Sequence, residues 1–78
     1  MADKPEQIRT AILTFAATDG DIFDASSLVI GIAGISGKAD VEAAHNLIVR
    51  DAVASPDDPV LQRAVFLLEE LLRLRIWL

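Results

Sequence analysis

The chain has 78 residues, which is enough for one domain and near the lower end of what folds alone. It contains no cysteine, so disulfide and thiolate chemistry are excluded. The net charge of −5 opposes non-specific binding to nucleic acid or to an anionic membrane surface. Because 53% of the residues are hydrophobic, more than so short a chain can bury, we expect a single domain over residues 1–78 that forms a homo-oligomer.

Segments for targeting or chemistry are not evident. The N-terminal sequence MADKPEQIR is polar and charged, unlike a secretory signal, and no apolar run approaches the ~20 residues of a membrane helix. With one histidine, His45, and no cysteine, a zinc site lacks its usual ligands and a catalytic dyad lacks an evident nucleophile. We expect a cytoplasmic protein with no membrane contact, no enzymatic activity, no catalytic residue, no metal and no cofactor.

The first helix is expected over residues 5–17. The sequence Asp3-Lys4-Pro5-Glu6 offers a capping aspartate, an early proline and an acid three residues after the cap. Apolar residues then recur at helical spacing. Residues 18–21, TDGD, have the composition of a turn.

A second helix is expected to begin at a cap among Asp24, Ser26 and Ser27, and to end at Ser36 with Gly37 as a left-handed residue beyond it. Its glycine-rich sequence LVIGIAGISG, residues 28–37, is not a phosphate-binding loop. That motif has four residues between its first glycine and its Gly-Lys pair, whereas five residues separate Gly31 from Gly37-Lys38 here. Ala39 stands where the motif needs a hydroxyl.

A strand over residues 28–36 remains an alternative because the segment is rich in β-branched residues. Three glycines would weaken such a strand, and the chain offers no second strand to pair with it. We favour a buried helix in which Gly31, Gly34 and, past the end, Gly37 lie near one flat side that another helix approaches closely. The packing would offset the ~1 kcal/mol that an interior glycine costs.

The second half of the chain predicts two amphipathic helices. Asp40 is a candidate cap for a third helix with a regular apolar face. The sequence SPDDP, residues 55–59, stops that helix and starts the next with an aspartate cap and a proline in the first turn. The last helix is expected from Pro59 almost to Leu78. For the third helix, the spacing predicts an apolar face made of Val41, Ala44, Ile48 and Ala52.

Two further motifs are incomplete. Residues 19–24, DGDIFD, begin like a calcium-binding loop, but Phe23 and Ile30 occupy positions that need oxygen ligands. Residues 24–28, DASSL, are similar to the Asp-Ser-Leu motif of acyl carrier proteins. The aspartate is misplaced, and the acidic helix that should follow is replaced by the apolar glycine-rich one.

Residues 27–53 have the pattern of a helix-turn-helix, with a turn at 34–37 and Val41 and Leu47 directed inward. If Ala33 and Gly37 take the small-residue and turn positions, the inward residue becomes Ala43. This third of the chain resembles the winged-helix and repressor families, and the resemblance implies recognition of DNA by the third helix. Neighbouring acids oppose contact with phosphates. The alternative DNA-binding residues are Lys38, His45, Asn46 and Arg50.

The last helix has two features that indicate interfaces. Its apolar residues cover more than half of its circumference, which is too wide for one contact in a small monomer. We expect the dimer interface to comprise Leu61, Val65, Leu68, Leu72 and Arg75, the last of which can extend its stem or pair with an acid of another chain. The polar side carries a stripe with the composition of an interaction hot spot, although a terminal tryptophan can also fold back over the core. The residues of this stripe are Phe66, Glu70, Arg73 and Trp77.

The sequence therefore predicts an all-α, four-helix domain with a helix-turn-helix-like central hairpin and a long C-terminal amphipathic helix. The expected function is that of a small acidic protein-binding module, such as a regulator, adaptor or inhibitor of a larger complex, acting as a homodimer. Small acidic helical proteins of this kind are common among phage and mobile-element inhibitors. The alternative is a helix-turn-helix transcriptional regulator, the only case in which nucleic acid is a partner.

Overall fold

The computed structural model describes residues 3–78, which form four helices and no strand. Helix α1 spans Lys4–Ala16, α2 spans Ile22–Ala33, α3 spans Lys38–Ala54 and α4 spans Pro59–Arg73. The expected all-α, four-helix fold is confirmed. The segment 28–33 is helical, so the strand alternative is excluded for these residues.

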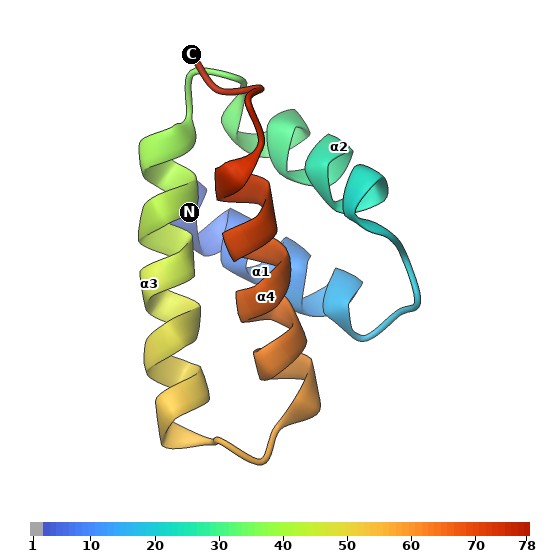
Figure 1. Ribbon diagram of the computed structural model, residues 1–78. Helices are drawn as coiled ribbons and strands as arrows, with labels where there is room; N and C mark the ends of the chain where they lie inside the picture. Colours follow the sequence, from blue (N-terminus) through green and yellow to red (C-terminus); the bar gives the residue numbers. More distant parts are fainter. Residues whose placement is uncertain (1–2) are drawn as a thin grey trace.

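Helices α3 and α4 run antiparallel side by side, α1 crosses behind them, and α2 covers the remaining side (Figure 1). The Cα radius of gyration is 11.4 Å. The C-terminal segment returns to the turn between α2 and α3, where the backbone N–H of Leu78 donates to the carbonyl of Ile35 at 2.8 Å. The end of the chain is thereby attached to the central hairpin.

Aspartates cap three of the helices, as short polar side chains do where backbone N–H groups lack partners. Asp3 accepts from the N–H of Glu6 at 3.0 Å, and Asp58 accepts from Val60 and Leu61 at 2.9 and 3.3 Å. Both of these caps were expected from the sequence.

The expected starts of α2 and α3 were wrong. Helix α2 begins earlier than Asp24, Ser26 or Ser27, because Asp21 caps it by accepting from the N–H of Asp24 at 3.1 Å. This start places the half-buried Ile22 against the core. Helix α3 begins at Lys38 after Gly37, with no side-chain cap, so Asp40 lies in its first turn.

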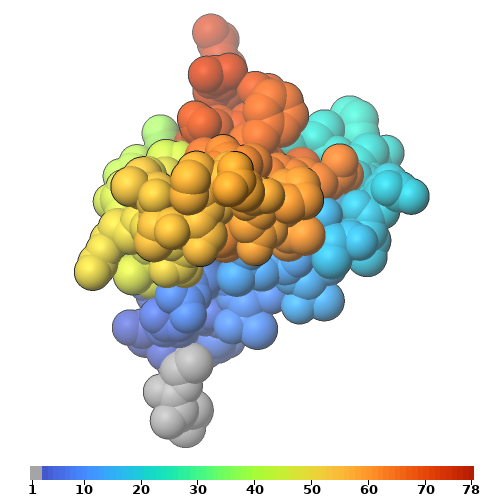
Figure 2. All heavy atoms as spheres, turned by 90° about the horizontal axis from the view of Figure 1, so that it is seen from below, coloured from blue at the N-terminus to red at the C-terminus, as the bar shows by residue number. Residues whose placement is uncertain are grey.

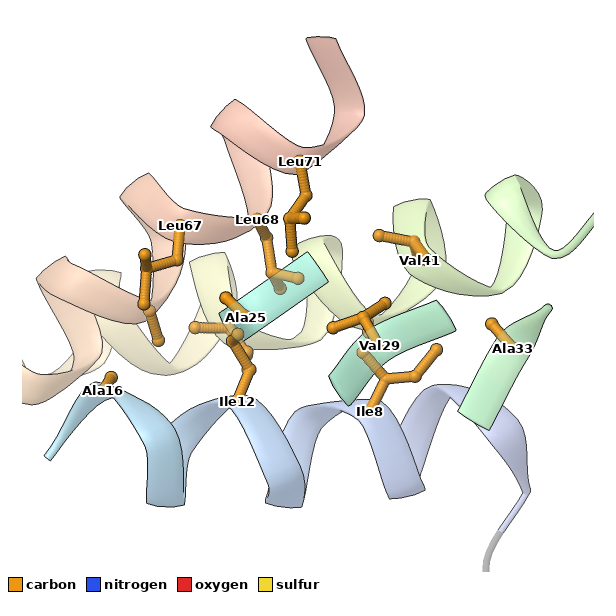
Figure 3. Close-up of a cluster of buried hydrophobic side chains, with 13 residues drawn as sticks. Ile8, Ile12, Ala16, Ala25, Val29, Ala33, Val41, Leu67, Leu68 and Leu71 are labelled. Carbon is orange, nitrogen blue, oxygen red and sulfur yellow. The ribbon is translucent and has the colours of Figure 1, made fainter. Parts of the chain in front are cut away.

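The core is built from one apolar face of each helix (Figure 3). Alanines recur in it, and their small side chains let helix backbones come close together. Ile8 and Ile12 of α1 point toward the leucines of α4 and toward α2 in Figure 3. The buried face expected for α3 is confirmed, and Val41 rather than Ala43 is its fully buried inward residue. The buried residues are Ile8, Ile12, Ala16, Ala25, Val29, Ala33, Val41, Ala44, Ile48, Ala52, Ala64, Leu67, Leu68 and Leu71.

The turn between α2 and α3 depends on two glycines. Helix α2 ends at Ala33, and Gly34 has φ 77° and ψ 165°, a conformation nearly confined to glycine. A Cβ on Gly37 would lie 2.3 Å from the carbonyl oxygen of Ala33, so a side chain there would displace the backbone. The expected helix end at Ser36 and the left-handed conformation at Gly37, whose φ is −96°, were wrong.

The expected flat side of α2 was also wrong. Gly31 is exposed, and a Cβ added there or at Gly34 would meet nothing within 4 Å. No helix therefore packs closely against these glycines. The inner face of α2 consists of Ala25, Val29 and Ala33, and its buried area offsets the low helix propensity of Gly31.

Helix α4 ends at Arg73, earlier than expected, because the backbone of Leu74 is extended, with φ −69° and ψ 145°. The carbonyl of Leu71 accepts from the N–H of Leu74 at 3.2 Å and from the indole Nε1–H of Trp77 at 2.9 Å. Both donors satisfy a carbonyl that the end of a helix leaves without a partner. The indole therefore helps to turn the chain away from the helix axis.

Within residues 3–78, no single helix is long and apolar enough to cross a membrane. Helices α2 and α3 have sufficient length and apolar composition only when taken together, and they are bent by 114° relative to each other.

The different roles of Gly31, within α2, and Gly34, just after its end, predict opposite effects of the same substitution. Gly31→Ala should raise the free energy of unfolding by up to ~1 kcal/mol, because alanine favours the helix and the site is open. Gly34→Ala should lower it by ~1–3 kcal/mol, because alanine is strained at φ 77°. Urea unfolding of the two variants and the unaltered chain measures both values, and shifts in the same direction would contradict this account.

Candidate protein-interaction surface

The side of α4 that faces α2 carries an exposed aromatic side chain, Phe66. Among the aromatic residues of the described chain, only Phe23 is more exposed. Phe66 is 61% exposed and lies at a hollow of about 300 Å³ between α4 and the start of α2. Apolar atoms of Ile22 and Leu67 line the hollow, and the carboxylates of Asp21 and Glu70 stand at the same place. We call this the Phe66 surface. Its lining residues are Gly20, Asp21, Ile22, Arg63, Phe66, Leu67 and Glu70.

Arg63 holds the two sides of the Phe66 surface together. Its Nη2 donates to the carbonyl of Gly20 at 2.8 Å, a bond between α4 and the connection that precedes α2. A charged donor makes a stronger hydrogen bond than a neutral one, although exposure to water reduces its net value. The hollow is therefore bordered by elements that are fixed relative to each other.

Charge at the Phe66 surface is predominantly negative. Glu70 pairs with Arg73 one turn along α4, at 2.9 Å, and both side chains remain partly exposed. Asp19 and Asp24 are exposed on either side of Asp21 in the sequence. Of the charged residues that line the hollow itself, Asp21 and Glu70 are acidic and Arg63 is basic. The surface combines an aromatic ring with a net negative field.

Trp77 does not extend the Phe66 surface. Its indole packs against the core cluster and donates to the carbonyl of Leu71. The predicted stripe is therefore divided: Phe66 and Glu70 line the hollow, Arg73 pairs with Glu70, and Trp77 belongs to the fold.

The residues expected at a dimer interface do not form one face. Leu68 is 0% exposed, so it lies in the core and is not accessible to another chain. Leu61 and Val65 are half-buried. Leu61 lines a hollow beside α1 and Val65 lines another between α3 and α4, whereas Leu72 packs against the core. Arg75 is exposed beyond the end of α4. The wide apolar face of α4 is divided because α1, α2 and α3 all contact it.

The residues of the DNA-binding alternative are only partly available. Lys38, Asn46 and Arg50 are exposed on α3, together with Glu42. The Nε2 atom of His45 is buried and has no hydrogen-bond partner. His45 is therefore directed toward the protein and cannot read a base edge with that atom.

A hollow larger than that of the Phe66 surface, about 440 Å³, lies between α1 and the connection from α3 to α4. Both of its carboxylates are engaged: Asp51 pairs with Arg9 at 3.3 Å, and Asp58 caps α4. No group of three or more histidine or acidic side chains within residues 3–78 is arranged to hold a metal ion. Unlike the Phe66 surface, this hollow is lined by no aromatic residue of the described chain.

Five of the residues that line the Phe66 surface were not expected from the sequence: Gly20, Asp21, Ile22, Arg63 and Leu67. The turn composition of residues 18–21 indicated an exposed connection, but not which helix it would meet. Arg63 and Phe66 are three residues apart and so share a side of α4, which was the one available signal.

Comparisons with known proteins supply no relative. No protein-family model matches the chain, and neither a curated protein nor a solved structure matches it.

Substitutions of Phe66, in α4, and of Trp77, beyond its end, should differ in their effect on stability. Trp77→Ala should lower the free energy of unfolding by ~1–3 kcal/mol, less than for a fully buried ring, because it removes a half-buried side chain and a hydrogen bond. Phe66→Ala should change it by ~0.5 kcal/mol or less, as is usual at exposed positions. Thermal and urea melts measure both, and a larger loss for Phe66→Ala would place that ring in the fold.

Proposed function

We propose that this protein is a small acidic protein-binding module whose partner docks on the Phe66 surface. The observation that supports the proposal is the 61% exposure of an aromatic ring beside a hollow of about 300 Å³ lined by apolar and acidic residues. Aromatic residues beside a pocket contribute a large share of binding energy at protein interfaces. A regulator, adaptor or inhibitor of a larger complex fits this arrangement, since such modules act by occupying a surface.

The chemistry of the Phe66 surface favours one class of partner. An apolar side chain would fill the hollow against Ile22, Phe66 and Leu67. Lysine or arginine residues next to it would meet Asp21 and Glu70 and the exposed acids nearby. The expected partner is therefore a protein segment with an apolar anchor between basic residues, and the overall charge of −5 would accelerate its association.

Self-association is the second part of the proposal. The surplus of apolar residues supports a homodimer, and exposed apolar side chains include Val53 at 75% and Leu78 at 86%. The dimer need not involve the Phe66 surface, because exposed apolar residues also occur on other helices.

A helix-turn-helix DNA-binding regulator is the second candidate. It is favoured by the bend of 114° between α2 and α3 across a short turn with two glycines, which lies within the range of this motif. Asn46 and Arg50 would then face the major groove. The buried Nε2 of His45, the neighbouring Glu42 and the net charge oppose this function.

A peptide-array experiment tests the proposed function. On an array of short synthetic peptides of varied charge, the protein should bind those with an aliphatic or aromatic residue between lysines or arginines. Phe66→Ala should weaken this binding at least ~30-fold, as loss of a hot-spot residue does. Glu70→Lys should weaken binding to basic peptides further at low salt. Leu28→Ala, at a 37% exposed position outside the hollow, is the matched control.

The outcome of this experiment is decisive in either direction. Binding that Phe66→Ala leaves unchanged, or no preference for basic peptides, would exclude the Phe66 surface as the docking site.

Binding to DNA separates the two candidates. The proposed protein-binding module should not be retained on duplex DNA near physiological salt, because its charge is repelled by phosphates. The DNA-binding alternative instead requires retention that falls steeply with salt and is reduced by Asn46→Ala. Electrophoretic mobility and fluorescence anisotropy with a mixed-sequence duplex measure this, and salt-dependent retention would replace the proposed function by the alternative.

A further inference from the structure

A third hollow, of about 290 Å³, lies between α3 and α4, on the side of α4 away from the Phe66 surface. None of its lining residues carries a charge, whereas each of the other two hollows described above includes two carboxylates. We call it the Val53 groove. Its lining residues are Val49, Ala52, Val53, Pro56, Gln62 and Val65.

Val53 projects beside this groove. It lies in the last turn of α3 and is 75% exposed. At an exposed helical position, lysine, arginine, glutamine or glutamate would favour the helix more than valine does. Local helix formation thus gives no reason for valine here. The groove and the projecting side chain together form an apolar patch near the end of the α3–α4 hairpin. The connection between these two helices faces the viewer in Figure 2.

We propose that the Val53 groove is the contact between two copies of this chain. Each copy has a net charge of −5, so two copies repel each other and are best joined through a face without acids. The groove is such a face. It is also self-complementary, because a two-fold axis beside Val53 would place each projecting valine in the hollow of the other copy.

Charges around Val53 fit the same two-fold arrangement. Arg50 lies three residues before Val53 and Asp57 lies four residues after it, and both are exposed. Neither makes an ion pair within residues 3–78. In an antiparallel crossing of two such segments at Val53, we expect Arg50 of each copy to lie toward Asp57 of the other, which follows Val53 in the turn after α3. Exposed ion pairs of this kind add little affinity, but they define the orientation of the two copies.

This inference rests on the self-association part of the proposed function and gives it a location. Of the residues expected at the dimer interface, only Val65 lines the groove. The Phe66 surface lies across α4, on the side of α2 (Figures 1 and 2). The two surfaces share no residue, so both can be occupied at once.

The first test is the mass of the protein and of two glutamate variants. Light scattering and sedimentation over a range of concentrations should give twice 8.4 kDa for the unaltered chain. Val53→Glu should raise the dimer dissociation constant at least ~30-fold while the helical circular dichroism and the melting of the monomer persist. Phe23→Glu, at a 78% exposed position that lines neither hollow, is the matched control and should remain a dimer.

The second test exchanges charges. Arg50→Asp should weaken the dimer because it places two acids opposite each other, and adding Asp57→Arg should restore it because the pair is reversed. Restoration by the second substitution would not follow from a merely structural role of either residue.

Several results would overturn the inference: a monomer at every concentration, a Val53→Glu variant that remains a dimer, or a charge exchange that fails to restore the dimer. Peptide binding is measured on the same samples. A monomer that still binds basic peptides would overturn the inference and retain the Phe66 surface as a docking site. A dimer that binds no peptide would retain the Val53 groove as the dimer contact and exclude the Phe66 surface.

Discussion

The turn from Gly34 to Gly37 is the constraint on which the arrangement of the molecule depends. Gly34 adopts a backbone conformation that other residues reach only with strain, and Gly37 leaves room for the carbonyl of Ala33. Together they bend the chain by 114° between α2 and α3. That bend directs α2 across α1 and α4, so that Asp21 and Ile22 reach the side of α4 that carries Phe66. The same turn receives the C-terminal segment through the hydrogen bond from Leu78 to Ile35.

A second general feature is that the buried side chains are aliphatic residues and alanines. Alanines stand at many of the contacts between helices, and no aromatic residue is fully buried among residues 3–78. Such a core brings backbones close together but covers only a narrow strip of each helix. Larger apolar residues therefore form a half-buried layer around it, including Phe15, Ile22, Val65 and Trp77. The high hydrophobic content is thus distributed between the core, this layer and exposed side chains such as Val53 and Phe66.

Helix α4 organises both surfaces that we propose for interactions. It contacts the three other helices through its inner face, while its two flanks face α2 on one side and α3 on the other. The flank toward α2 is acidic and bears an aromatic ring, which suits a basic partner. The flank toward α3 is uncharged, which suits a second copy of a negatively charged chain. Some of the acids have structural roles as well, since Asp3, Asp21 and Asp58 cap helices.

The sequence by itself determined the helical class, the number of helices, the caps at Asp3 and Asp58, and the buried face of α3. These features depend on residues within a few positions of one another, so spacing and composition are sufficient to predict them. The sequence also predicted that Phe66 and Glu70 share a side of α4, because residues four apart lie on the same side of a helix.

Only the tertiary structure decided which glycines are required, where Trp77 lies and how the apolar face of α4 is divided. Gly31 is open and Gly37 is not, because of what lies opposite each of them rather than their neighbours in sequence. Leu68 is buried and Phe66 is exposed because α1, α2 and α3 cover parts of α4 that periodicity cannot distinguish. Likewise, the indole of Trp77 is held by a carbonyl of Leu71 that becomes available only where α4 ends. Periodicity gives the sides of a helix, whereas the packing of the other helices decides which sides remain exposed.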